Sequence, residues 1–507
     1  MSEKSIAPTV TVLILGMFIA ILNQTMVNVA IPHMMTDLNV STTTVQWLST
    51  GFMLANAIMI PISAFLMESI STRILFAMAM AMFTIGSLIC GLGPTFSIVL
   101  VGRIVQAIGA GVLMPLVTNI FLRIFPPEHM GRAMGMMGIA MMFAPALGPT
   151  FAGYMVEHFS WRILFFVMVP LGAIEVILTF KYLSNILKLT YPKLDWQGAV
   201  LSTVGFGALL YGLSEAGSRG WGDPVVDISI IVGVLSLIFF VIREMTTSSP
   251  LLNLTVFKNL TFTMSTVVSV IVNMAMFGAM LLLPIYVQNI RGYTALESGL
   301  LLLPGALLMG VMSPISGTLF DKFGVRPLAI IGLVITSITT YQFTKLTDES
   351  TYYHLMTLYA LRSFGISFIM MTIMTEGLNA LPPKLKSHGT AVSNTMRQVA
   401  SSFGTAVLVT VMSTRTTEHV ASYSNNLTLS NTIASENFAN LGAGISSLTG
   451  LPSEMGGAYT LSIIGGLVTK ASTISGINDA FVVATIITVI GIFFSLFLKR
   501  PKKISEG

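Results

Sequence analysis

The chain has 507 residues, of which only 9% are charged and 54% are hydrophobic, and its mean hydropathy is +0.83. Because a soluble protein carries about 25% charged residues, this composition excludes an ordinary soluble fold. The net charge of +5 does not indicate nucleic acid, since the basic residues stand at the ends of apolar runs. The single cysteine, Cys90, leaves no disulfide framework and no cysteine metal site. The sequence therefore predicts an all-α polytopic membrane protein with no metal and no cofactor.

Apolar runs recur at the length that a helix needs to cross a bilayer, about 20 residues. The first run, from Thr9 past Pro32, is too long for a signal peptide and is expected to stay in the membrane. We count about 14 spans in this way: six, then two, then six more. They lie near 9–31, 46–67, 74–92, 97–122, 133–155, 162–183, 197–215, 225–243, 262–289, 297–319, 327–345, 354–378, 389–413 and 479–498.

Lysines and arginines indicate the orientation, because cytoplasmic loops carry an excess of them. With the N-terminus inside, most of the 26 basic residues fall in inner segments. An even number of spans then places both termini in the cytoplasm. One long outer segment, 414–478, is rich in Ser, Thr, Gly and Asn, a composition that buries little. We expect a loose segment there, with a cap over an outer vestibule as the alternative.

Three features of the first half return in the second half at nearly the same interval, which indicates an internal repeat. They are the acids Glu68 and Asp321, the arginines Arg103 and Arg362, and the Pro-Pro pairs at 126 and 382. Two six-helix halves with a binding site between them are typical of a secondary transporter. We therefore divide the chain into a six-helix bundle at 1–185, two inserted helices at 186–260, and a second six-helix bundle at 261–507.

A charged turn follows the tenth span, formed by Asp321, Lys322, Gly324 and Arg326. Opposite charges at an inner interface can hold the two halves together, although an ordinary positive loop would look similar. The corresponding turn in the first half has lost its glycines and keeps Glu68 and Arg73 at its two ends. We expect it to hold the halves more weakly.

The fourth and fifth spans carry further motifs. The fourth has Arg103-x-x-Gln106, and a charge inside the membrane must find a partner or water. The alternative is an arginine that reaches to the outer surface. The fifth span has Gly148-Pro149, where the helix must bend and pack closely.

These motifs belong to a set by which the sequence resembles the major facilitator superfamily, and specifically its fourteen-helix drug:proton antiporters of the bacterial lincomycin-efflux and multidrug group. The resemblance runs from about residue 9 to 410. It is carried by Leu22 to Pro32, Val45-Gln46-Trp47, Arg103-x-x-Gln106, Gly148-Pro149, Ser160-Trp161-Arg162, Leu283-Pro284-x-Tyr286-x-Gln288, Leu303-Pro304-Gly305, the turn at Asp321 and Arg397-Gln398. It implies the major facilitator fold, a bacterial cell membrane, the Gly-Pro motif of proton-driven exporters, and a turn that controls opening toward the cytoplasm.

The first span departs from the family's pattern at Asn23, where many relatives carry an aspartate. An amide cannot take up or release a proton at physiological pH, so proton coupling is expected elsewhere. Acids inside or near spans can carry a proton because burial favours the neutral form. The candidates are Glu376 and Glu175, and then Glu157, for which a structural ion pair or a gate is the alternative.

Polar side chains beside aromatic ones can orient an amphiphilic substrate without demanding one charge. The candidates are Asn23, Gln24, Asn28, Gln46, Trp47, Tyr286, Gln288 and Asn289. The chain's 34 methionines suit a cavity that accepts dissimilar apolar shapes. The loss of the first-span acid favours neutral or variably charged substrates over dications.

Other classes fit less well. No Gly-x-x-x-x-Gly-Lys loop supports an ATP-driven pump, and no His-x-x-x-His pair supports a metalloenzyme. A channel or a sensor without transport stays open as an alternative, although the repeated halves and the charged turn at Asp321 fit alternating access better. The sequence thus predicts a monomeric, non-enzymatic, proton-coupled exporter of amphiphilic drugs, such as lincosamide antibiotics or dyes, in the lipid bilayer. The alternative is an exporter of an endogenous metabolite or signalling molecule.

Overall fold

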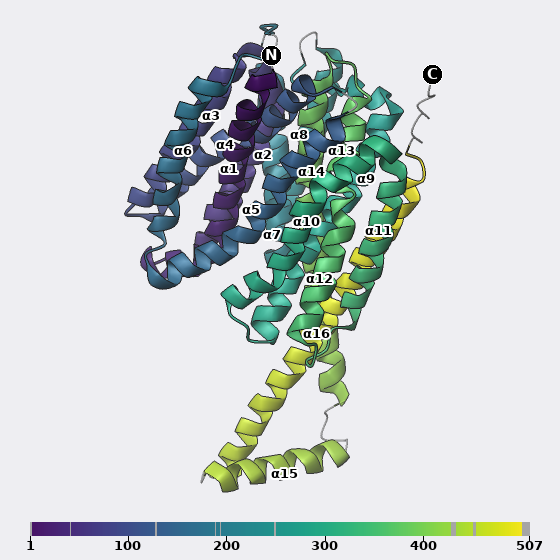
Figure 1. The fold of residues 1–507 in the computed structure, drawn as a ribbon. Helices are drawn as coiled ribbons and strands as arrows, with labels where there is room; N and C mark the ends of the chain where they lie inside the picture. Colours follow the sequence, from purple (N-terminus) through teal and green to yellow (C-terminus); the bar gives the residue numbers. More distant parts are fainter. Residues whose placement is uncertain are drawn as a thin grey trace.

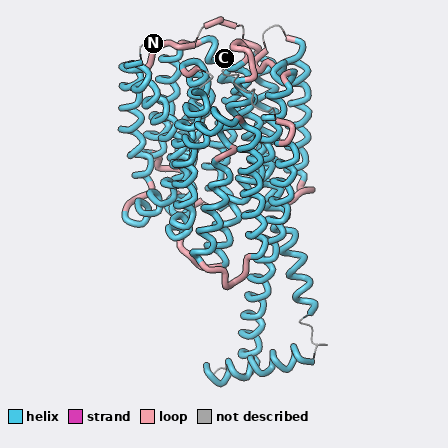
Figure 2. The backbone as a smooth tube through the Cα atoms, turned by 45° about the vertical axis from the view of Figure 1, so that its right-hand side comes forward, coloured by secondary structure: helices cyan, strands magenta, loops and turns pink. Residues whose placement is uncertain are grey.

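The computed structural model describes residues 3–40, 42–126, 129–187, 189–192, 194–247, 250–426, 432–449 and 453–498. This part of the chain is helical, with short loops and no strand (Figure 2). Helices satisfy their own backbone hydrogen bonds, as a segment surrounded by lipid must. The start of α1 and the end of α16 lie at one end of the bundle, which we call the inner end (Figure 1).

The first bundle contains six helices, and small residues bring several of them close together. A Cβ atom added to Gly109 of α4 would lie 2.3 Å from the carbonyl oxygen of Ala79 in α3. One added to Gly148 of α5 would lie 2.1 Å from Oγ1 of Thr25 in α1. The six helices are α1 (Glu3–Asp37), α2 (Thr42–Ser69), α3 (Thr72–Leu92), α4 (Phe96–Ile124), α5 (Met130–His158) and α6 (Arg162–Tyr182).

Two inserted helices, α7 (Trp196–Arg219) and α8 (Pro224–Thr246), pack on each other beside the two bundles. Helix α7 touches both bundles, through α2 and α14. The ring of Trp47 in α2 stacks on Tyr211 in α7 with centroids 5.4 Å apart. Most side chains of α8 are exposed and apolar, as expected for a helix that faces lipid.

The second bundle is formed by the remaining long helices, of which α12 and α13 make one interrupted span. Its helices are α9 (Leu260–Ile285), α10 (Ala295–Phe323), α11 (Val325–Gln342), α12 (Tyr352–Ser367), α13 (Met370–Asn379), α14 (Lys386–Asn426) and α16 (Ser453–Ser495). The short segments are η2 (Leu254–Lys258), η3 (Tyr286–Ile290), a π-helical turn after α9, and η4 (Phe343–Lys345).

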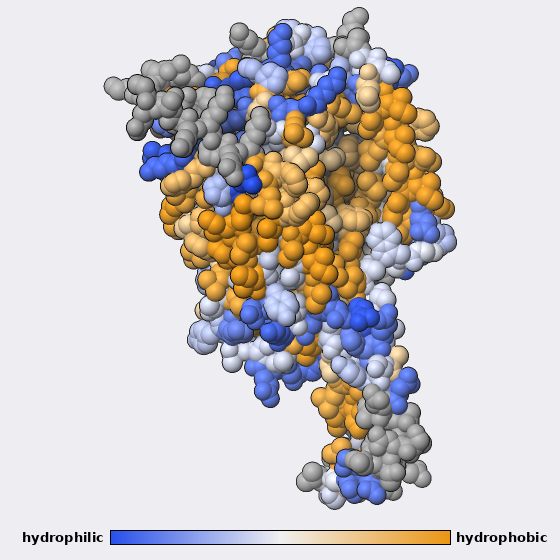
Figure 3. All heavy atoms as spheres, turned by 90° about the vertical axis from the view of Figure 1, so that its right-hand side faces the viewer, coloured by the Kyte–Doolittle hydropathy of each residue, from blue (hydrophilic) through white to orange (hydrophobic). Residues whose placement is uncertain are grey.

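Thirteen helices of the described residues are long and apolar enough to cross a membrane. They overlap thirteen of the fourteen expected spans, although the last candidate span begins at Met455, well before the expected 479. The other, at 389–413, lies within the more polar helix α14, which packs against α9 and α16. On the face that Figure 3 shows, apolar residues cover the middle of the molecule and polar residues gather toward its ends.

The segment 414–478 corrects one expectation. Its described parts, 414–426, 432–449 and 453–478, are helical rather than loose. They form the end of α14, helix α15 (Thr432–Thr449) and the start of α16, and they project as an arm from the end opposite the termini (Figure 1). Glycine and serine are spread among apolar residues here, so composition alone concealed the helices.

Candidate functional site

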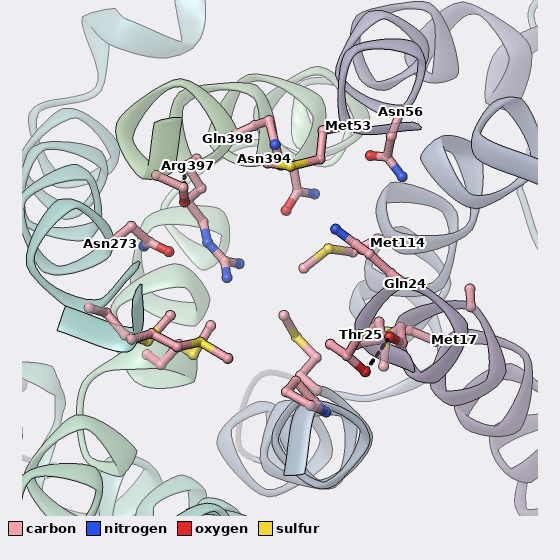
Figure 4. Close-up of a pocket in the computed structure, with 18 of the residues that line it drawn as sticks. Met17, Gln24, Thr25, Met53, Asn56, Met114, Asn273, Asn394, Arg397 and Gln398 are labelled. Atoms are coloured by element: carbon pink, nitrogen blue, oxygen red, sulfur yellow. Dashed lines mark hydrogen bonds between the residues drawn. The ribbon is translucent and has the colours of Figure 1, made fainter. Parts of the chain in front are cut away.

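A cavity of about 260 Å³ lies between the two bundles and takes its lining from both (Figure 4). Methionines form much of its wall, with Met17, Met53 and Met114 from the first bundle and Met309 and Met370 from the second. Methionine is flexible and polarizable, so such a wall can adapt to apolar groups of different shape.

Polar side chains interrupt this wall on both sides. They are Gln24, Thr25 and Asn56 from the first bundle and Asn273, Tyr359, Arg362, Ser363, Asn394, Arg397, Gln398 and Ser401 from the second. Neither Asp nor Glu occurs among the described lining residues. The cavity therefore offers amides, hydroxyls and two arginines, but no acid.

Helices α5 and α10 form a close seam between the bundles, from the cavity to the inner end. A Cβ atom on Gly131 would lie 2.3 Å from the carbonyl oxygen of Gly317, and one on Gly317 would lie 2.0 Å from that of Gly131. Gly138 is as close to Ser313, whose Oγ would be 2.0 Å from an added Cβ. Larger side chains would separate the two halves at these positions.

Asp321 stands at the inner end of this seam. Its Oδ1 accepts a hydrogen bond from the backbone N–H of Gly131 at 2.9 Å, and its Oδ2 accepts one from that of Arg132 at 3.1 Å. The carboxylate thus caps the N-terminus of α5, where unpaired N–H groups and the helix dipole favour a negative charge. The turn continues through Lys322 to Gly324 (φ +76°), a conformation that suits glycine, and Arg326 follows in α11.

Glu68 also connects the bundles, but not through Arg73. Its Oε1 lies 3.4 Å from Nε2 of His388 in α14, and its Oε2 accepts a hydrogen bond from Thr190 at 3.1 Å. Arg73 instead donates to the carbonyl oxygen of Leu183 at 2.6 Å. The two ends of the first-half turn therefore act separately, and only the acid reaches the other bundle.

Two further hydrogen bonds join the bundles at the inner end. The side chain of Asn119 donates to Ser387 at 2.6 Å, and Arg123 donates to the carbonyl oxygen of Pro383 at 3.2 Å. Together with the hydrogen bonds of Asp321, these contacts hold the two bundles together at the inner end in this conformation.

Arg103 is fully buried inside the first bundle rather than at its surface. Its Nη1 donates to the side-chain oxygens of Asn23 and Gln106, each at 2.9 Å, and its Nε donates to the carbonyl oxygen of Leu48 at 3.1 Å. Its guanidinium carbon lies 4.1 Å from the centre of the Phe52 ring. The alternative of an arginine that reaches the outer surface is wrong, because these partners hold it inside.

The candidate proton carriers lie apart from one another. Glu175 on α6 is 1% exposed and its Oε1 lies against Gly16 of α1, away from the cavity lining. Glu376 on α13 is half-buried, toward the inner end. Glu157 is exposed at the far end of α5.

Trp161 and Arg162, which follow Glu157 closely in the sequence, pair with a different acid. Arg162 forms an ion pair with Asp37, and Nε1 of Trp161 donates to the same carboxylate at 3.0 Å. Asp37 follows the apolar part of the first span, so its position at the entry to a loop concealed this role.

Among the predicted substrate contacts whose side chains the structure describes, only Gln24 lines the cavity. Asn23 faces Arg103, and Asn28 accepts a hydrogen bond from Ser49 at 2.7 Å. Trp47 stacks on α7, and Tyr286 is buried with its hydroxyl donating to the carbonyl oxygen of Thr347 at 2.6 Å. Gln288 and Asn289 lie in the turn after α9, outside the lining, and the side chain of Gln46 lies outside those described.

Several lining residues were missed by the sequence reasoning, notably Asn56, Asn273 and Asn394. Asn56 and Asn273 are amides inside apolar spans, which is costly in lipid and is itself a signal of function. Asn394 lies in the more polar helix α14, where an amide is less conspicuous. Arg362 and Arg397 were noted only as part of the repeat and of the resemblance.

The two bundles, the inserted helix pair and the shared central cavity define a secondary membrane transporter. The chain matches the Major Facilitator Superfamily over residues 13–405. YhcA of Bacillus subtilis, described as an uncharacterized MFS-type transporter, is 48% identical over 97% of this chain and 92% of its own length. The lincomycin resistance protein LmrB of the same organism is 38% identical over 99% of this chain and 97% of its own length. This chain therefore belongs to the Major Facilitator Superfamily.

A solved structure agrees with this assignment. The crystal structure of the human transporter MFSD10, described as an organic anion transporter, has a TM-score of 0.63 and covers 96% of this chain and 99% of its own. At 11% identity, this likeness shows the fold alone.

Proposed function

We propose that the protein exports amphiphilic drugs from the cytoplasm by alternating access, in exchange for protons. The observation that carries this proposal is the central cavity, which both bundles line and whose wall combines methionines with amides. A cavity of this kind can bind different apolar bodies and orient their polar ends. The likeness to a lincomycin resistance protein supports a drug as substrate.

The inner end is assigned to the cytoplasm of a bacterial cell by the positive-inside rule, and the protein is taken as a monomer because one chain holds both bundles. In this assignment the hydrogen bonds of Asp321, Asn119 and Arg123 between the bundles support a state closed to the cytoplasm. Asp321, with Lys322, Gly324 and Arg326, is proposed to control opening on that side. Gly148, Pro149, Arg103, Gln106, Glu68 and Arg73 are proposed to support the same conformational change.

Glu175 is the proposed proton carrier. It lies between α6 and α1 in a mostly apolar setting, where a charged carboxylate is costly and the neutral form is favoured. Movement of α1 during the cycle would change its access to water, which is how a buried acid can load a proton in one state and release it in the other. Glu376 and then Glu157 are the second and third candidates.

The experiment uses purified protein in liposomes that contain a pH dye. A proton gradient is imposed, lincomycin, ethidium or the anionic dye dansylglycine is added, and wild type is compared with Glu175→Gln and Glu376→Gln. Glu349→Gln, in an exposed loop, is the matched control.

Substrate-triggered proton movement that is lost only in Glu175→Gln supports the proposed carrier. Loss in Glu376→Gln alone assigns the role to that residue, and no loss in either moves it to Glu157. If wild-type protein moves no protons with any of the three compounds, drug:proton antiport is contradicted and an endogenous metabolite becomes the better substrate.

A further inference from the structure

The charge of the central cavity is positive. Arg362 and Arg397 contribute to its lining, and none of the described lining residues is acidic. Both arginines are nearly fully buried, at 2% and 7% exposure. A buried charge is costly unless it is paired, and a guanidinium keeps its charge in proteins.

The two arginines differ in their partners. Arg362 is held by its own bundle, because Nε donates to Oγ1 of Thr340 and Nη2 donates to the carbonyl oxygen of Ala275, both at 3.2 Å. Arg397 has only a weak acceptor among the described residues, the sulfur of Met374, at 3.5 Å from Nη1. Most of the five donors of its guanidinium are therefore left for a ligand.

The orientation of Arg397 agrees with a role in binding a ligand. Its guanidinium points into the middle of the cavity, and Asn394 on the same helix points toward the same space (Figure 4). Asn394 is 4% exposed, and neither its side-chain oxygen nor its nitrogen has a hydrogen-bond partner among the described residues. A fixed charge and an unpaired amide, one helical turn apart, thus face one cavity.

Nothing in the described lining offsets this charge. The first bundle could supply an acid at position 23, but Asn23 there accepts a hydrogen bond from Arg103 without cancelling its charge. Glu175 is buried on the other side of α1, outside the lining. A cationic ligand in this cavity would meet two like charges and no counter-ion, at short range and in a low dielectric.

We propose that the cavity selects amphiphiles that carry an anionic group, such as a carboxylate, and that Arg397 binds this group with Asn394. The planar fork of arginine matches a carboxylate with two parallel hydrogen bonds. The methionine wall accepts the apolar body of the same molecule. This proposal rests on the proposed function only in taking the cavity as the transport site, and it narrows the substrate class.

The test uses three probes with the same aromatic body: dansylglycine, which is anionic, its methyl ester, which is neutral, and dansyl-ethylenediamine, which is cationic. Binding to the full-length protein in detergent is followed by dansyl fluorescence. Wild type is expected to bind dansylglycine most tightly. Arg397→Gln is expected to weaken that binding by roughly 10- to 100-fold, as for a lost hydrogen bond to a charged group, and to leave binding of the ester unchanged.

Three further variants sharpen the result. Arg397→Lys keeps the charge without the fork, so its loss should be smaller. Arg219→Gln removes an exposed arginine of α7 and should have no effect. Gln24→Glu places an acid on the opposite wall of the cavity. It should therefore weaken the binding of dansylglycine and strengthen the binding of dansyl-ethylenediamine. This last variant decides the question if Arg397→Gln does not fold.

Equal binding of the three probes by wild type overturns the proposal, as does an unchanged preference in both Arg397→Gln and Gln24→Glu. Transport of the same probes into inverted liposomes separates this outcome from the proposed function. Export of the ester and the amine as well as the acid supports export and overturns the anion preference. Binding of dansylglycine that depends on Arg397, with no transport of any probe, supports the anion site and overturns export.

Discussion

The side-chain oxygen of Asn23 accepts a hydrogen bond from Nη1 of Arg103 at 2.9 Å in the interior of the first bundle. The side-chain nitrogen of Asn23 has no partner among the described residues. The position thus holds a buried donor that is unpaired and an arginine that no acid neutralises.

Asn23→Asp is therefore expected to stabilise the fold. A carboxylate removes the unpaired donor and turns a neutral acceptor into a charged one, which is worth about 1 kcal/mol more. The measurement is the midpoint of thermal unfolding in detergent, which should rise. Asn28→Asp is the matched control, because Asn28 is exposed and accepts from Ser49. A lower midpoint for Asn23→Asp would contradict the expected pairing.

Asp321→Ala is expected to open the inner end. It leaves the backbone N–H groups of Gly131 and Arg132 without their acceptor, at a cost of about 1–3 kcal/mol for each group that stays buried. The measurement is maleimide labelling of Thr390→Cys, a fully buried position on α14. Labelling should rise in the double variant, and Cys90 adds little background because it is buried.

Asp321→Asn retains one acceptor oxygen and should give a smaller increase. Asp227→Asn, an exposed position on α8, should leave labelling unchanged. Equal labelling with and without Asp321 would show that this residue does not hold the inner end closed.

The contact between Glu68 and His388 predicts a second contribution to closure of the same end. Oε1 of Glu68 lies 3.4 Å from Nε2 of His388 in the other bundle. Glu68→Gln and His388→Ala each weaken this contact, so each should increase the labelling of Thr390→Cys. Because the two residues act as a pair, the double variant should add little to either single variant. Fully additive increases would exclude the pair as their cause.

Asp37 predicts an acid-dependent loss of stability at the other end. The hydrogen bond from Arg162, and then that from Trp161, lowers the pKa of Asp37 below its ordinary value of 3.8. The stabilisation is therefore complete above that value and is lost as pH falls through the lowered pKa. Because the side chain of Asp37 is 48% exposed, it amounts to about 1 kcal/mol or less.

The unfolding midpoints of wild type and Asp37→Asn should differ at neutral pH and converge in acid. In an Arg162→Gln background, Asp37→Asn should have a much smaller effect, because the two residues act as a pair. Full additivity of the two substitutions would contradict the ion pair.

The sequence was sufficient to predict the fold because a lipid bilayer strongly constrains the length and composition of the helices that cross it. Helix length follows from membrane thickness, and thirteen spans could be located from apolar runs alone. The turn at Asp321 could be recognised from its charges and glycines. The contacts of Asp321 could not be predicted from the sequence, because its partners are backbone N–H groups 190 and 189 residues away in the chain.

The cavity was harder to foresee. A span buries some faces and exposes others, and a run of apolar residues does not show which face meets the other bundle. Tyr286 and Gln24 are both polar side chains in apolar spans, yet the first packs inside its own bundle and the second faces the cavity. A search for an acid to pair with each charged residue inside an expected span would have identified Arg397, because no partner for it is evident in the sequence.

The unmatched arginine also bears on the energy of the transport cycle. A cation that leaves the cell as one proton enters moves no net charge, so the membrane voltage does no work on the exchange. An anion that leaves as one proton enters carries two elementary charges across the membrane, both in the direction that a negative cell interior drives. At about 2.3 kcal/mol per charge for 100 mV, voltage alone would contribute about 4.6 kcal/mol to each cycle. A cavity with arginine and no acid would thus make the protein an electrogenic exporter, able to concentrate its substrate outside even where the two sides have the same pH.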